Sequence, residues 1–111
     1  MQKESLIALA RHHLDAAHRA SSGRSAHTVY GGHERVLRQT LIALRATSNL
    51  DDHENPGEAT LQVLHGRVTL VVGENRWNGS PGDLMFIPDS RHSLEAVEDS
   101  VILLTVAKRT G

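Results

Sequence analysis

The strongest constraint on the fold is a series of short apolar segments, each closed by residues that favour turns. The segments are three to seven residues long, most are rich in Val, Ile and Leu, and their separators contain Gly, Pro, Asn, Asp and Ser. Many short strands at regular spacing are typical of a β-sandwich or β-barrel. We therefore predict strands over residues 59–65, 68–72, 76–78, 84–87, 92–97 and 101–107.

The first part of the chain has a different periodicity. Residues 3–20 place apolar side chains at helical spacing and end at Ser21-Ser22-Gly23, which predicts one amphipathic helix packed outside a sheet or on a partner subunit. Residues 26–30 are predicted to form a short strand. Residues 33–47 would suit either a helix or a strand, and the β-branched Thr40 and Ile42 favour a strand.

The size and composition limit the class of protein. A chain of 111 residues has room for one core. We divide the chain into an N-terminal helix at 1–23 and an all-β domain at 24–111. Its 12 basic and 13 acidic residues are mixed and leave no basic face for nucleic acid, and no apolar run reaches the length of about 20 residues that spans a membrane. The absence of cysteine excludes disulfides and thiolate sites, and the polar start is unlike a signal peptide, so we expect a cytoplasmic protein.

Strand alternation over residues 59–65 predicts which side chains face the interior. Ala59, Leu61, Val63 and His65 share one face, whereas Thr60, Gln62 and Leu64 share the other.

Two half-motifs, each with a histidine, stand on either side of a central hairpin. In the first, His53 and Asn55 precede Val63-Leu64-His65-Gly66, and in the second, Gly82-Asp83 is followed after five residues by Pro88 and then by His92. This arrangement resembles the cupins, whose motifs are G-x5-H-x-H-x3,4-E-x6-G and G-x5-P-x-G-x2-H-x3-N. The resemblance implies an all-β, double-stranded β-helix (jelly-roll) barrel, preceded here by one α-helix.

The resemblance also implies a metal site, and this chain departs from it at the ligands. Counting back from Gly66, His53 takes the first histidine position, Asn55 the second, and Ala59 the position of the glutamate. His92 fits the last histidine one residue early, and Thr47 stands where the first motif opens with glycine. His53 and His92 remain as candidate ligands of a divalent metal ion, with Asn55 as an additional weak donor.

Other residues are candidates for the missing ligand. Glu58 would need a bulge to turn toward the interior, because a shift of one residue reverses the side of a strand. His27 or His33 would need to lie across the barrel mouth.

The function that we favour from the sequence is the binding of a small molecule inside the barrel. His53, Asn55 and His92 would orient the ligand, and apolar side chains would line its pocket: Leu61, Val63 and Leu94, with Met85 or Phe86. Buried imidazoles need hydrogen-bonding partners, which a ligand carboxylate or carbonyl would supply.

Alternatives remain open at this point. One is a metal-dependent cupin enzyme of the dioxygenase, isomerase or decarboxylase type, and another is a non-catalytic module that senses an effector. Arg38 or Arg45 could reach a ligand carboxylate, whereas Trp77 is expected to pack on the outer face. Homodimerisation is common among cupins, and we expect a homodimer.

Overall fold

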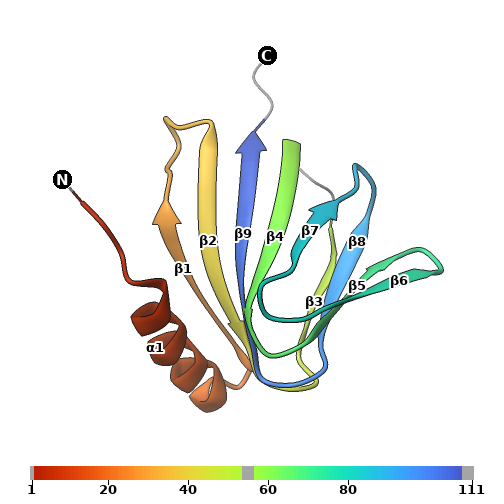
Figure 1. Cartoon of the computed structure of the whole chain (residues 1–111), viewed down its shortest axis with the longest axis horizontal. Helices are drawn as coiled ribbons and strands as arrows, with labels where there is room; N and C mark the ends of the chain where they lie inside the picture. The colour runs from red at the N-terminus through yellow and green to blue at the C-terminus, as the bar shows by residue number, and fades with distance from the viewer. Residues whose placement is uncertain (1, 54–56, 109–111) are drawn as a thin grey trace.

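The computed structural model describes residues 2–53 and 57–108, without the side chains of residues 52 and 53. In the described residues, one helix precedes nine strands that form two antiparallel sheets (Figure 1). The helix is α1 (Leu6–Arg19), and the strands are β1 (Arg24–Tyr30), β2 (Leu37–Leu44), β3 (Asn49–His53), β4 (Gly57–His65), β5 (Val68–Val72), β6 (Asn75–Gly79), β7 (Leu84–Ile87), β8 (His92–Ala96) and β9 (Ser100–Lys108).

The two sheets face each other across the core. The larger sheet has the order β1-β2-β9-β4-β7 and the smaller one the order β3-β8-β5-β6. Alternate residues of most strands point inward, and their side chains form an apolar cluster between the sheets. Leu61, Val63 and Leu94, which the sequence predicts to be interior, belong to this cluster and are almost completely buried.

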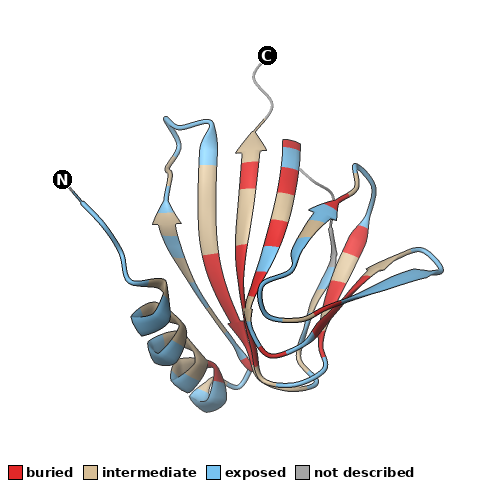
Figure 2. Cartoon of the chain, viewed as in Figure 1, coloured by how far each residue is buried: buried red, intermediate tan, exposed pale blue. Residues whose placement is uncertain are grey.

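Helix α1 covers the outer face of the larger sheet beside β1 and β2 (Figures 1 and 2). Ser5 caps its first turn by accepting a hydrogen bond from the Ala8 N–H at 3.2 Å. Ala17 packs against Leu41 and Ala43 of β2, which point away from the barrel interior. This confirms the predicted position of the helix outside a sheet. No helix in the described part of the chain is long and apolar enough to cross a membrane.

Most predicted strands are present within one or two residues of their predicted ends, and residues 37–44 form a strand rather than a helix. Two details differ from prediction. Residues 49–53 form β3, which the sequence reasoning did not identify as a strand. The pairing of β4 with β9 shifts between Val63 and His65, so His65 leaves the inner face and is exposed.

Candidate functional site

His92 is the polar side chain that the fold places most clearly inside the barrel. It begins β8, is only 3% exposed, and lies on the same face as Leu94 of the core. Its Nδ1 lies 2.9 Å from the backbone oxygen of Ser90. A carbonyl oxygen only accepts hydrogen bonds, so Nδ1 carries the proton, and Nε2 holds the lone pair when the ring is neutral. The Ser90 carbonyl thus fixes the ring and its tautomer.

The backbone brings the two motif histidines together. His53, the last residue of β3, pairs with His92 of β8. The pairing places the backbones of the two histidines side by side. The His53 side chain and the whole of Asn55 lie outside the described residues, so their roles as ligand or metal donors stay predictions.

Below His92 the barrel is filled by side chains. A cavity of about 20 Å³ remains between the sheets, bounded by His92 and by apolar side chains: Leu50, Leu61, Leu70, Ile87, Leu94, Ile102 and Leu104. Such a volume holds about one water molecule. This packed layer forms a floor, and any larger ligand must lie above it, toward the end of the barrel where β2 begins.

Two cationic residues lie at this end of the barrel. Arg38 has the parity of Ile42 and Leu44 in β2, so it is on the inner face, and its side chain is partly exposed. Lys108 has the parity of Val106 in β9, and its Nζ donates to the backbone oxygen of Gly32 at 3.1 Å. Burial along β2 decreases from Leu44 to Leu37, which identifies this end as the open one. Arg38 and Lys108 therefore place two cationic residues on the inner face at this end.

The described residues do not complete the metal centre that the motif resemblance implies. Ala59, at the position of the glutamate, lies on the inner face of β4 and contributes no donor. Glu58 is exposed on the opposite face, and the regular pairing of β4 from Gly57 to Val63 leaves no bulge that would turn it inward. Within the described residues, no three His, Asp or Glu side chains are grouped so that they could hold a metal ion. A metal-dependent enzyme would therefore rely on His53 and Asn55.

The two other histidines considered as ligands lie elsewhere. His27 is on the outer face of β1, where its ring stacks on His13 of α1 with centroids 5.4 Å apart. His33 is exposed in the segment between β1 and β2. The idea that His27 supplies a ligand across the barrel mouth is therefore wrong. The pKa of His13 is lowered, mainly by desolvation and further by the neighbouring His12 and His27.

Arg45 has a structural role. Its guanidinium donates to the backbone oxygens of His18 and Ala20, at 3.1 and 3.5 Å, and so satisfies carbonyl groups at the end of α1. Of the two arginines proposed to reach a carboxylate ligand, only Arg38 is at the barrel opening.

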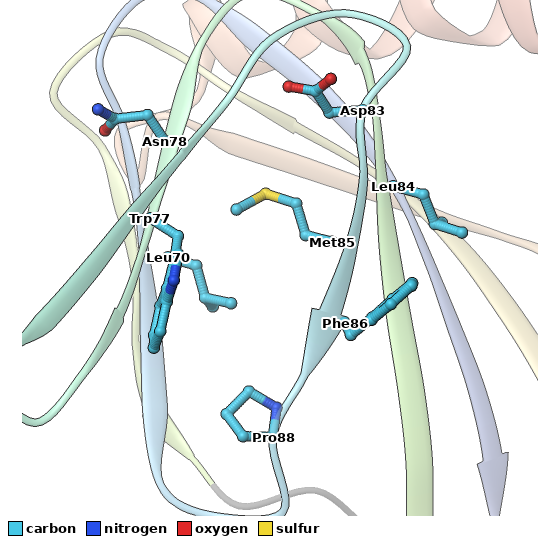
Figure 3. Close-up of a pocket in the computed structure, with 8 residues that line it drawn as sticks. All are labelled: Leu70, Trp77, Asn78, Asp83, Leu84, Met85, Phe86 and Pro88. Carbon is cyan, nitrogen blue, oxygen red and sulfur yellow. The ribbon is translucent and has the colours of Figure 1, made fainter.

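A second concave region lies at the side of the barrel, and sequence reasoning missed it. Trp77 pairs with the core residue Leu70, so it is on the inner face of β6 and not on the outer face as predicted. Together with Met85 and Phe86 of β7 it lines a pocket of about 520 Å³ (Figure 3). Phe86 itself points outward and is 78% exposed, whereas Met85 and Ile87 of β7 pack on the core.

Comparison with known proteins identifies the fold. No family model matches the chain. Among solved structures, a conserved protein of unknown function from Streptococcus pyogenes has a TM-score of 0.73 and 22% identity over 83% of this chain and 80% of its own. A cupin superfamily protein from Desulfitobacterium hafniense has a TM-score of 0.72 and 13% identity over 78% of each chain.

The same fold also occurs in a larger enzyme. Salicylate 1,2-dioxygenase from Pseudoaminobacter salicylatoxidans has a TM-score of 0.69 and 20% identity, over 79% of this chain and 25% of the enzyme. Together with the two facing antiparallel sheets, these likenesses show that the protein has a cupin-like fold, preceded by one N-terminal helix.

Proposed function

We propose that the protein binds a small organic acid at the open end of the barrel and needs no metal ion to do so. The observation that carries the proposal is the buried His92 imidazole, whose ring is fixed by its hydrogen bond to the Ser90 carbonyl. A protonated imidazole donates hydrogen bonds to a carboxylate, and a neutral one can accept from a ligand hydroxyl.

The charges at the opening favour an anion over a neutral or cationic ligand. Arg38 and Lys108 stand on the inner face of the larger sheet, and His92 stands on the inner face of the smaller one. A carboxylate bound between the sheets would receive hydrogen bonds from charged donors, which are roughly twice as strong as those between neutral groups. Arginine suits this role because its planar fork matches the two carboxylate oxygens.

The apolar residues set the depth at which the ligand lies. Leu61 and Leu94 form the floor beneath His92, and Val63 lies deeper in the packed core. His53 and Asn55 would complete the polar side of the site, in keeping with the register of β3 and β8. The lack of a carboxylate ligand at Ala59 supports binding without an obligatory metal, since a divalent ion favours a negatively charged ligand set.

Nuclear magnetic resonance of the histidine rings tests this proposal. Metal-stripped protein is titrated with acetate, succinate and benzoate, and with benzamide as a neutral match for benzoate. The His92 signals, assigned with a His92→Gln variant, should shift saturably with at least one acid. We expect benzamide to bind several-fold more weakly than benzoate, since it lacks the charge that Arg38 and Lys108 attract.

Two arginine variants locate the binding site. Arg38→Gln should weaken binding about three- to tenfold, because one charge-assisted contact is lost. Arg11→Gln removes the same charge from the exposed surface of α1 and should leave the affinity unchanged. If none of the acids shifts the His92 signals, or if both variants weaken binding equally, the proposed site is wrong.

A further inference from the structure

The pocket at the side of the barrel has the size and the lining of a ligand site. It lies between β6 and β7, which are the edge strands of the two sheets (Figures 1 and 3). Its volume of about 520 Å³ falls within the range of about 300–1,000 Å³ that is usual for small-molecule pockets. Six of the eight described residues that line it are apolar or aromatic: Leu70, Trp77, Leu84, Met85, Phe86 and Pro88.

The position of Trp77 beside the pocket is set by the pairing of β6 with β5. Trp77 pairs with Leu70, which is 3% exposed, while Trp77 itself remains 48% exposed beside the pocket. Met85 lies between the two edge strands in Figure 3. Its approach to β6 depends on Gly79, because a side-chain carbon added to Gly79 would lie 2.6 Å from the Met85 sulfur. Trp77 thus lines the pocket on the side of β6, and Met85 lines it from β7.

One charge stands at the end of this pocket. Asp83 is the only ionisable residue among the described residues that line it. Its carboxylate accepts a hydrogen bond from the Ser80 N–H at 2.9 Å, and its backbone oxygen accepts one from the Val63 N–H at 3.0 Å. The carboxylate is therefore fixed by the turn before β7 and by the pairing of that turn with β4.

We propose that this lateral pocket binds a small organic cation with an apolar body. The face of an indole ring attracts a cation through its quadrupole, and a carboxylate at the same site supplies the opposite charge. An anion would meet repulsion from Asp83 and no described cationic side chain among the lining residues. The inference is independent of the proposed acid site, because the side chains of Leu70 and Met85 pack on the core between the pocket and the barrel interior.

The single tryptophan of the chain makes a direct assay available. Three soluble probes of similar size are titrated while the fluorescence of Trp77 is recorded: benzyltrimethylammonium, benzyl alcohol and benzenesulfonate. We expect saturable quenching by the cation, an affinity for it about threefold higher than for the alcohol, and no saturable binding of the sulfonate. Sedimentation at the same protein concentrations separates ligand binding from self-association.

Variants assign the two parts of the site. Asp83→Asn keeps an oxygen for the Ser80 N–H and should lower the affinity for the cation about threefold. Glu74→Gln makes the same charge change outside the pocket and should leave that affinity unchanged. For Trp77→Leu, the Met85 methyl resonance replaces the fluorescence signal, and binding should weaken about tenfold. Equal affinities for the three probes, an unchanged affinity in Asp83→Asn, or a fluorescence change that follows self-association alone would overturn the proposal.

Discussion

Two glycines with similar backbone conformations should respond very differently to the same substitution. Gly66, between β4 and β5, has φ = +81°, and Gly73, in the β5–β6 turn, has φ = +59°. A side-chain carbon on Gly66 would overlap the backbone oxygen of Asp99 and lie 2.8 Å from Cα of Ser100. A side-chain carbon on Gly73 would meet no atom within 4 Å. The pair therefore separates conformational strain from steric overlap.

The loss of stability expected for each variant follows from these surroundings. Gly73→Ala costs only the left-handed conformation, about 1 kcal/mol. Gly66→Ala adds an overlap with backbone that cannot rotate away, which brings its cost to about 2–4 kcal/mol. The larger value is a substantial part of the roughly 5–15 kcal/mol that stabilises an ordinary domain. Ser100 makes the site stiffer, because its hydroxyl accepts from the Arg67 N–H at 3.0 Å and is buried.

Urea denaturation at 25 °C, followed by circular dichroism, measures both changes in the free energy of unfolding. The prediction requires Gly66→Ala to lower the free energy of unfolding by at least about 1 kcal/mol more than Gly73→Ala does. Equal losses would mean that the loop before β9 does not press on Gly66, and the steric argument would fail.

Three further changes have expected outcomes. Thr47 is the one described residue other than glycine with a positive φ, +73°, so Thr47→Gly should raise the free energy of unfolding by about 1 kcal/mol in urea denaturation. Because the pKa of His13 is lowered on folding, the unfolded chain takes up that proton first as the pH falls below the ordinary value of 6.5. Wild-type stability should therefore fall between pH 7 and pH 5 more steeply than that of His13→Gln, and parallel pH profiles would contradict this. The pKa of Asp99 is lowered, mainly by the hydrogen bond from the Ala46 N–H, so its stabilisation is complete above the ordinary value of 3.8 and is lost as the pH falls through the lower folded value. Asp99→Ala should cost about 1 kcal/mol at pH 7, with the deficit disappearing near pH 2, and a deficit that persists there would refute the electrostatic origin.

The architecture was largely predictable because its signals are local. Strand alternation places Leu61 and Val63 in the core, and turn residues mark most strand ends within one or two residues. For residues 33–47, a strand was favoured by β-branched side chains and by the neighbouring predicted strands, and the structure confirms a strand at Leu37–Leu44. β3 was missed because Asn49–His53 is polar and carries no apolar alternation.

The errors in the predicted surroundings of the site arise from pairing between distant strands. The shift between Val63 and His65 reverses the predicted face of His65, and no local sequence signal marks it. Trp77 was placed on the wrong face because its side depends on its register with Leu70. His27 was considered for the barrel mouth, yet α1 covers the face of β1 on which it lies.

At Thr47 the sequence departs from the cupin motif, but the backbone there has a conformation that suits glycine. Thr47 occupies the position of the opening glycine and has a positive φ, where a β-branched residue is strained. Its N–H donates to the backbone oxygen of Ala96 at 2.9 Å, which helps to hold this conformation. The motif thus describes a backbone shape better than it describes a ligand set.

The most direct test of the proposed function compares ligand binding with and without metal. Protein purified without chelator and a chelated control are analysed for metals by plasma mass spectrometry. Both are then titrated with the acid that shifts the His92 signals, before and after addition of iron, manganese, nickel, copper or zinc. We predict equal affinities in every preparation. Binding that occurs only after metal is loaded would contradict the account and would assign the site to a metal centre that includes His53.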